Sequence, residues 1–358
     1  MLILIGIMYQ IILCFLTAFI LTYIAIPSII NIAKVKKLTD EPGERTSHSK
    51  SIPTLGGIGI FAGVLFSIIL WTPFQVFGNL QYILCAFVII FLVGAKDDIL
   101  PLTPYKKMLG QVFAAAILVF KANIRISSFY GIFGIQELPM WFSIIFSLFT
   151  ILVIINAFNL IDGINTLCAS TGVLICVTLG YWFKETDQVV LSIISFALVG
   201  SLIAFMKFNI SPAKIFMGDT GSMLVGTICA ILAISFIEVN KTMEPSELKI
   251  ISAPAFTIAI LFIPLYDTLR VFIIRIFNGR SPFTPDKQHI HHVLISLGMN
   301  HLQATSLLIS VNTIVIMMTF SLIELGNFNL LVMILVLGCT FSAVIHFLVK
   351  RSPKGLLL

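Results

Sequence analysis

The chain has 358 residues, of which 58% are hydrophobic and only 11% are charged. Charged residues make up about a quarter of an ordinary soluble domain, so this composition excludes a soluble globular protein. The formal net charge of +6 is attributed to membrane topology and to contact with anionic lipid and substrate, and nucleic acid is not an expected partner. The sequence therefore predicts a single integral membrane domain over residues 1–358.

Eleven apolar segments are each about long enough to cross a bilayer as a helix, which takes about 20 residues. The N-terminal segment lacks the basic start and short apolar centre of a cleaved signal peptide, so it is the first predicted span. The six cysteines show neither pairing nor metal-ligand spacing and are interpreted as packing residues. The predicted fold is an all-α polytopic membrane protein with spans near residues 3–31, 54–72, 80–96, 106–121, 139–156, 167–183, 188–206, 221–238, 249–275, 303–323 and 329–349.

Lysine and arginine predict the orientation, because they concentrate in cytoplasmic loops. With the N-terminus outside and the C-terminus in the cytoplasm, seventeen of the 22 fall on the cytoplasmic side, and the other five are Lys121, Arg125, Lys184, Lys241 and Lys249. The outer segment 121–139 alternates and contains glycines, which predicts a small β-hairpin. The cytoplasmic loops, which hold the polar clusters, lie near residues 33–53, 96–107, 156–167, 207–220 and 276–302.

The first two cytoplasmic loops carry groups suited to phosphate. Gly56 and Gly57 would allow a phosphate to approach the backbone, with Lys50 as its partner, although helix packing explains these glycines equally well. Asp97 and Asp98 are adjacent carboxylates, which repel each other unless a cation lies between them or one is protonated. The alternative is an ordinary acidic loop beside Lys106 and Lys107.

The third loop follows a long uncharged segment with Asn156, Asn159, Asp162 and Asn165 at intervals of three. These residues share one face if the helix continues, whereas Gly163 predicts that it ends there. Polar groups of this kind are costly against lipid, so they are expected to face a wet cavity or the protein interior. A structural polar network between helices is the alternative.

The last two loops add a carboxylate and a histidine cluster. Asp219 lies in a Gly-Asp-Thr-Gly-Ser turn before a span, where it caps the helix or helps to hold a metal–phosphate complex. The His-x-His-His run at 289–292 fits a zinc site less well than anion recognition beside Arg280 and Lys287. Asp267 and Arg270, three residues apart, are expected to pair, and Pro254 and Pro264 to bend their span.

Four ordered motifs, AKDDIL, NAFNLIDGIN, FMGDTGS and SPFTPDKQHIHH, resemble the polyprenyl-phosphate N-acetylhexosamine-1-phosphate transferases of glycosyltransferase family 4. The resemblance runs from about residue 52 to 294. The chain is more similar to the undecaprenyl-phosphate GlcNAc-1-phosphate branch of the family than to the related phospho-N-acetylmuramoyl-pentapeptide transferase. It implies transfer of N-acetylhexosamine-1-phosphate from a UDP-sugar to polyprenyl phosphate, with release of UMP. Cell-envelope glycan synthesis, such as that of O-antigen lipopolysaccharide, at the bacterial inner membrane is the implied setting.

The resemblance also implies cofactor and site residues. The cofactor is Mg²⁺, with Mn²⁺ as a candidate substitute and a homodimer as a candidate assembly. Asp219 and Asn159 are the implied metal ligands, and the implied catalytic residues are Asp97, Asp98, Asp162 and Asp219. The implied substrate-binding residues are Lys50, Lys107, Asn156, Asn165, Arg280, Lys287, His289, His291 and His292.

One departure from the family pattern concerns Asn165 and Thr166, which stand where many relatives have Asp and Gly. An asparagine can hydrogen-bond a uracil edge but carries no charge, so the position is expected to bind nucleotide. Changed sugar or nucleotide preference and lost activity are the alternatives. A transporter for an anionic solute is the main competing class; it usually places ionisable groups near mid-membrane and often shows inverted repeats, whereas these acids gather at one interface.

Overall fold

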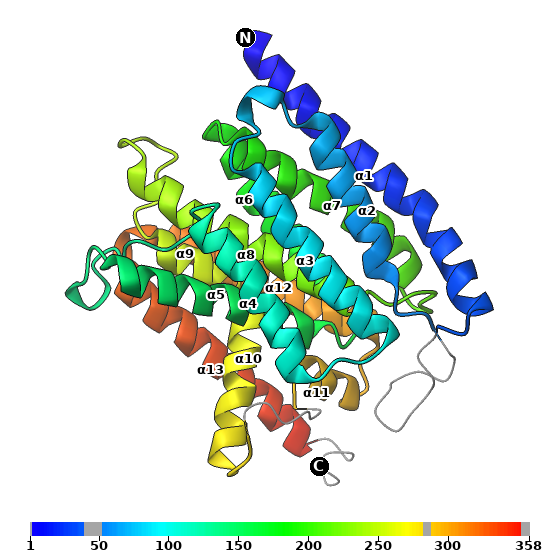
Figure 1. Cartoon of the computed structure of the whole chain (residues 1–358). Helices are drawn as coiled ribbons and strands as arrows, with labels where there is room; N and C mark the ends of the chain where they lie inside the picture. Colours follow the sequence, from blue (N-terminus) through cyan, green and yellow to red (C-terminus); the bar gives the residue numbers. More distant parts are fainter. Residues whose placement is uncertain (1, 39–51, 282–287, 352–358) are drawn as a thin grey trace.

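The computed structural model describes residues 2–38, 52–281 and 288–351, and these form α-helices without a β-strand (Figure 1). The all-α prediction is confirmed. The helices are α1 (Leu2–Val35), α2 (Gly56–Trp71), α3 (Leu80–Ile99), α4 (Pro104–Phe120), α5 (Met140–Ile161), α6 (Leu167–Glu185), α7 (Val189–Asn209), α8 (Gly218–Thr242), α9 (Ala253–Ile260), α10 (Phe262–Phe277), α11 (Ile290–Ser296), α12 (His301–Ser321) and α13 (Asn327–Arg351). The short 3₁₀ turns are η1 (Phe74–Val76), η2 (Ile132–Gly134) and η3 (Ile323–Leu325).

An α-helix covers each of the eleven segments predicted to span the membrane, with the ninth divided between α9 and α10. Within the described chain, seven helices are long and apolar enough to cross a bilayer, namely α1, α5, α6, α7, α8, α12 and α13. The bent pair α9 and α10 adds an eighth if it forms one span. The polytopic membrane fold is therefore confirmed, while the count of eleven spans and the orientation stay predictions.

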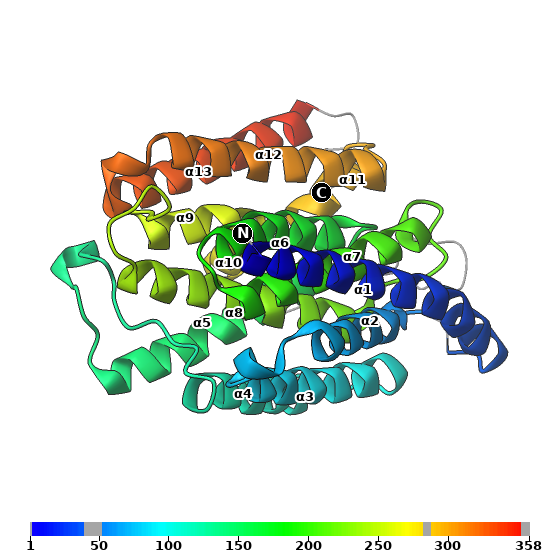
Figure 2. The same ribbon diagram turned by 90° about the horizontal axis from the view of Figure 1, so that it is seen from above.

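Helix α8 lies at the centre of the molecule. Its most apolar 18-residue window is 83% buried, against 17% for α13. Figure 2 shows α12 and α13 on one side, α3 and α4 on the opposite side, and α8 between them. Small residues allow this close packing, because a Cβ at Gly226 would lie 2.9 Å from the Cα of Ile155 in α5. Neighbours on several sides thus fix the position of the first turn of α8, which carries Asp219.

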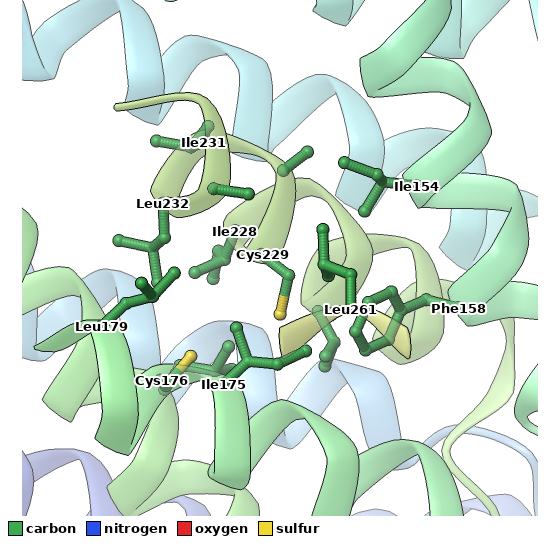
Figure 3. Close-up of a cluster of buried hydrophobic side chains, with 14 of the residues drawn as sticks. Ile154, Phe158, Ile175, Cys176, Leu179, Ile228, Cys229, Ile231, Leu232 and Leu261 are labelled. Atoms are coloured by element: carbon green, nitrogen blue, oxygen red, sulfur yellow. The ribbon is translucent and has the colours of Figure 1, made fainter. Parts of the chain in front are cut away.

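The apolar core is built where α5, α6 and α8 meet (Figure 3). Phe158 of α5, Leu179 of α6 and Ile228 of α8 are almost fully buried there. Cys176 and Cys229 lie in the same cluster and form no disulfide. These cysteines act as small apolar packing residues, as predicted, and Cys14 and Cys168 are buried and unpaired in the same way.

The predicted bend in the ninth segment is a break of 80° between α9 and α10. Pro264 lies in the first turn of α10; it has no amide hydrogen, and its ring would collide with the Ile260 carbonyl in a continuous helix, which favours a kink or a break here. The fully buried Asn312 of α12 binds the broken backbone: its Oδ1 accepts from the Ile263 amide at 3.0 Å and its Nδ2 donates to the Ile260 carbonyl at 3.1 Å. The buried break is therefore hydrogen-bonded.

The outer segment 121–139 doubles back on itself but is not the predicted β-hairpin. A single antiparallel bridge joins Ser128 and Glu137, and the turn η2 lies between them. Backbone hydrogen bonds cross the segment from the Leu138 amide to the Ser127 carbonyl and from the Phe129 amide to the Gln136 carbonyl, both at 2.8 Å. Glu238 of α8 also holds it, since its carboxylate accepts hydrogen bonds from the Ser127 amide and hydroxyl at 2.7 Å. The local alternation of the sequence does not reveal this long-range anchoring, which adds to the short backbone pairing.

Candidate active site

The polar motif at 156–165 begins in α5, and the helix ends just before Gly163, as the sequence predicts. α5 ends at Ile161, and residues 162–166 form a turn before α6 begins at Leu167. Thr166 has a left-handed φ of 66°, and its amide donates to Asn209 Oδ1 at 2.6 Å. Asn159 therefore remains on the last turn of α5 while Asp162 and Asn165 lie on the turn, so the four polar residues do not share one helix face.

Oxygen atoms from α3, α5 and α8 converge on one ammonium group. Lys107 Nζ, from the first turn of α4, lies 3.2 Å from Asp97 Oδ2 and 3.2 Å from Asn159 Oδ1. It also donates to Asp219 Oδ2. The Asn159 amide nitrogen in turn donates to Asp219 Oδ1 at 2.6 Å and to Ser222 Oγ at 3.0 Å. The fold thus joins residues from three of the predicted polar loops into one cluster.

Asp98 turns away from its neighbour Asp97 and binds the start of α8. Its carboxylate accepts from the amides of Asp219 at 2.7 Å and Thr220 at 3.0 Å, and from the Thr220 hydroxyl. The first amides of a helix have no partner within it, so Asp98 caps α8 from outside. The alternative in which Asp219 or Thr220 caps α8 is not what the structure shows, because no side-chain cap is present on the helix itself.

A cavity of about 580 Å³ opens beside this cluster. Its walls are Lys37, Leu38, Thr54, Asp97, Asp98, Ile99, Pro101, Asn159, Asp162, Gly163, Ile164, Asn165, Asn209, Phe216, Met217, Gly218 and Asp219. All four predicted catalytic aspartates therefore line the same space. Two lysines of the described chain lie near these four carboxylates. Lys37 lines the cavity, and Lys107 contacts Asp97 and Asp219. Even where Asp162 is protonated, the other three carboxylates outnumber these two ammonium groups, and such a cavity favours a bound cation.

The donor set fits a hard divalent cation such as Mg²⁺. In residues 2–38, 52–281 and 288–351, no three His, Cys, Asp or Glu side chains form a metal site on their own. Mg²⁺ commonly takes only one or two protein carboxylates and completes its coordination with substrate phosphates and water. The Lys107 ammonium, held by Asp97, Asn159 and Asp219, shows that this position attracts positive charge.

The glycines at the start of α2 serve packing. The amides of Gly56 and Gly57 donate to the carbonyls of Phe216 and Met217 at 3.0 and 2.8 Å, so they are not free to bind phosphate. A Cβ at Gly57 would collide with the backbone of Gly221 in α8. Of the two interpretations, close helix packing is the one the structure supports. Lys50 lies outside the described residues.

The other predicted substrate-binding asparagines differ in position. Asn156 faces α4, where its Nδ2 donates to Gln111 Oε1 at 2.9 Å, and it does not line the cavity. Asn165 does line the cavity, and its Nδ2 donates to Ser211 Oγ at 2.8 Å. The structural polar network thus accounts for Asn156, while Asn165 remains placed to meet a ligand.

The histidine cluster is anchored to α10. Asp267 is 2% exposed, and its Oδ2 lies 2.9 Å from His289 Nδ1 while its Oδ1 accepts from Arg270 at 2.8 Å. The predicted pair of Asp267 and Arg270 is confirmed, and His289 joins it. Arg280 is exposed and lies outside the cavity walls, and Lys287 lies outside the described residues.

His291 supports the cavity from behind. It is 1% exposed, and a Cβ on Gly163 would collide with its Nε2. Burial lowers the pKa of His291 to about 3, so its imidazole is neutral. His292 packs beside it, with ring centroids 4.2 Å apart. None of the three histidines lines the cavity, and His291 reaches it only through Gly163.

Among the described residues, the cavity aspartates Asp98 and Asp162 have no ion pair, and Asp98 is hydrogen-bonded by the start of α8 whereas Asp162 lines the cavity without such a cap. Burial raises the pKa of Asp162 well above its usual range, and the charges of Asp219 and Asp98 raise it further. Between its ordinary pKa and this raised value, the native state keeps a proton that the unfolded state has lost. Stability therefore falls as pH rises through that window.

We expect Asp162→Asn to remove this pH dependence. In detergent with EDTA, the variant should melt roughly 2–4 °C above the unsubstituted protein at pH 8, and the difference should vanish near pH 4. The matched control is Asp187→Asn, in the exposed connector between α6 and α7. Equal melting curves of Asp162→Asn and the unsubstituted protein at every pH would contradict the raised pKa.

Sequence reasoning missed the side chains that hold the 162–166 turn. The Asn165 amide donates to His301 Nδ1 at 3.2 Å, and its carbonyl accepts from Thr305 Oγ1 at 3.0 Å. Asn209 and Ser211 hold the turn from the other side. The position of Asn209 and Ser211 just after a predicted span was the available signal. Nothing in the sequence pairs these two residues with a turn more than 40 positions away.

The fold and the cavity define a multi-pass membrane protein with a carboxylate- and amide-lined site suited to a cation–phosphate complex. The family model described as glycosyl transferase family 4 matches residues 80–237. The decaprenyl-phosphate N-acetylglucosaminephosphotransferase of Mycobacterium leprae is 33% identical over 80% of this chain and 77% of its own length. The undecaprenyl-phosphate alpha-N-acetylglucosaminyl 1-phosphate transferase of Salmonella typhi is 32% identical over 75% and 71%.

A probable undecaprenyl-phosphate N-acetylglucosaminyl 1-phosphate transferase of Bacillus subtilis is 30% identical over 82% of this chain and 80% of its own length. The chain belongs to glycosyl transferase family 4, and within it to the polyprenyl-phosphate N-acetylhexosamine-1-phosphate transferases.

Proposed function

We propose that the protein transfers GlcNAc-1-phosphate from UDP-GlcNAc to polyprenyl phosphate and releases UMP. The observation that carries the proposal is the meeting of Asp97, Asn159 and Asp219 around one cation position beside a cavity of about 580 Å³. Relatives named as GlcNAc-1-phosphate transferases support the same chemistry. UDP-sugars other than UDP-GlcNAc are the alternative donors, because Asn165 at the cavity wall departs from the family pattern.

The reaction exchanges one phosphorus–oxygen bond for another. An oxygen of the acceptor phosphate attacks the sugar-bearing phosphorus, the bond to the UMP oxygen breaks, and polyprenyl-diphosphate-GlcNAc is formed. A phosphate monoester is mostly ionised at pH 7, so the main barrier is the approach of two anions. Asp97, at the end of α3, would accept the remaining proton of the acceptor phosphate, while Asp98 keeps α8 in place.

Asp219 and the Asn159 amide oxygen would hold Mg²⁺, with Mn²⁺ as a substitute. When bound, the metal would reduce repulsion between the two phosphates and stabilise the leaving UMP. Lys107 would remain beside the site as a cation for substrate phosphate. Asn165 would contact the nucleotide, and the excess of lysine and arginine in the site-bearing loops supports a cytoplasmic active site in the bacterial inner membrane.

The test is UMP release by the purified protein with UDP-GlcNAc, undecaprenyl phosphate and Mg²⁺. The proposal expects UMP only when the lipid is present, and none with EDTA. A panel of UDP-sugars under the same conditions identifies the preferred donor. Uptake of an anionic solute into vesicles without UMP formation would instead indicate a transporter.

We expect Lys107→Gln to reveal the cation position without turnover. Loss of the ammonium leaves Asp97 and Asp219 facing each other uncompensated, so the variant should melt below the unsubstituted protein in EDTA. Added Mg²⁺ should restore more stability to the variant than to the unsubstituted protein, because no ammonium competes for the site. Lys106→Gln, one residue earlier on the exposed face of α4, is the matched control. Absence of any Mg²⁺-dependent shift in either protein would contradict a metal at this position.

A further inference from the structure

A second cavity, of about 660 Å³, lies between α1, the end of α7 and the connector from α7 to α8. Its walls are Phe19, Ile203, Met206, Lys207, Phe208, Ile210, Ser211, Pro212 and Lys214. Ile203 and Ile210 are 37% and 48% exposed, so the apolar wall faces outward. Because α7 is a candidate membrane span ending at Asn209, the cavity lies at the end of a candidate span.

The polar part of this cavity is positively charged. Lys207, in the last turn of α7, and Lys214, in the connector, are both exposed. Neither is among the lysines that pair with carboxylates in the described chain. Lys207 Nζ instead lies 5.4 Å from the centroid of the Tyr23 ring, which also packs against Phe208. Two ammonium groups that have no carboxylate partner among the described residues thus border an outward-facing apolar wall.

We propose that this cavity binds one anionic phospholipid, with its headgroup phosphate at Lys207 and Lys214 and an acyl chain along Phe19, Ile203 and Met206. An apolar wall at span level with basic groups beside it matches a lipid that carries a net negative headgroup, and each such lysine favours an anionic lipid surface. The headgroup position is separate from the position proposed for the acceptor phosphate, because neither Asp97 nor Asp219 lines this cavity.

The site is connected to the candidate active site through the α7–α8 connector. Ser211, a wall of the second cavity, accepts the hydrogen bond of Asn165, a wall of the first. Just before the connector, Asn209 accepts from the Thr166 amide and donates to the Ile215 carbonyl at 2.8 Å. A lipid that holds the connector through Lys207 and Lys214 would therefore also stabilise the 162–166 turn.

The test is native mass spectrometry of the delipidated full-length protein in detergent, without UDP-sugar, so that its outcome does not depend on transfer activity. Phosphatidylglycerol is the anionic probe, phosphatidylcholine the zwitterionic control, and undecaprenyl phosphate the arm for the acceptor. We expect one tightly bound phosphatidylglycerol, and about 10- to 30-fold weaker binding in Lys207→Gln/Lys214→Gln. The matched control, Lys96→Gln/Lys106→Gln, removes the same charge from exposed positions on α3 and α4 and should bind as the unsubstituted protein does.

A second variant, Ile203→Trp, fills the apolar wall while leaving both lysines, and it should weaken phosphatidylglycerol binding as well. The proposal is overturned if the double lysine variant binds phosphatidylglycerol as the unsubstituted protein does, or if phosphatidylcholine binds equally well. It is also overturned if only undecaprenyl phosphate is displaced by the lysine substitutions, since the cavity would then belong to the acceptor.

Discussion

Asp219→Asn is expected to lower the turnover number of GlcNAc-1-phosphate transfer by about 10³-fold, the largest effect that any single substitution in the cavity should have. Asparagine keeps the size of the side chain but removes its negative charge. Asp219 both accepts from Asn159 at 2.6 Å and contacts Lys107, so the charge lies at the point where three helices meet. Its loss would weaken cation binding without opening a space in the core.

The control for Asp219→Asn is Asp187→Asn, because it makes the same chemical change at an exposed site. Asp187 has a left-handed φ of 58°, which asparagine adopts readily, so the control should fold and turn over normally. UMP release and melting temperature are measured for both variants. A folded Asp219→Asn protein that retains a tenth or more of the activity would show that this carboxylate is not the main metal ligand.

Gly218→Ala is expected to have the largest effect on the fold around the site. Gly218 has a φ of 71°, which costs an alanine about 1–2 kcal/mol. The added Cβ would also collide with the Thr54 carbonyl oxygen and lie 2.7 Å from both Asp98 carboxylate oxygens. The contact that caps α8 would have to open, and a displacement of about 1 Å at a catalytic group can cost about 10²-fold in rate.

The melting temperature of Gly218→Ala is compared with that of Gly279→Ala, which isolates the cost of the backbone conformation. Gly279 has a similar φ of 65°, but a Cβ there would have no heavy atom of the described residues within 4 Å. We expect Gly218→Ala to lose at least twice as much stability as Gly279→Ala. Equal losses in the two variants would mean that the approach of Asp98 to α8 is looser than the structure shows.

Much of the fold follows from the length and hydropathy of the segments, which is why a helix covers each predicted span. The outer segment and the break at Leu261 depend on long-range contacts that the local sequence does not predict. The outer segment has strand-like alternation, yet Glu238 holds it from a residue more than 100 positions away. Pro264 predicts a bend, but it does not predict the partner of the broken backbone, which is Asn312 of α12 with hydrogen bonds on both sides of the break.

The site was predictable in its residue types and only partly in its geometry. The adjacent carboxylates at 97 and 98 are equivalent in the sequence. In the fold, Asp97 pairs with Lys107, whereas Asp98 accepts hydrogen bonds from the first amides of α8. The glycines at 56 and 57 left phosphate binding and packing open, because both require a bare backbone. Only the partner surface, Gly221 of α8, decides between them.

The central claim is that a phosphosugar, and not the sugar alone, moves to the lipid. The most direct measurement uses UDP-GlcNAc labelled with ³²P on the sugar-bearing phosphate, incubated with the purified protein, undecaprenyl phosphate and Mg²⁺. We expect the label to enter the lipid phase in an amount equal to the UMP released. Label that remains in water-soluble UDP while GlcNAc reaches the lipid, or a protein that leaves the donor intact, would contradict it.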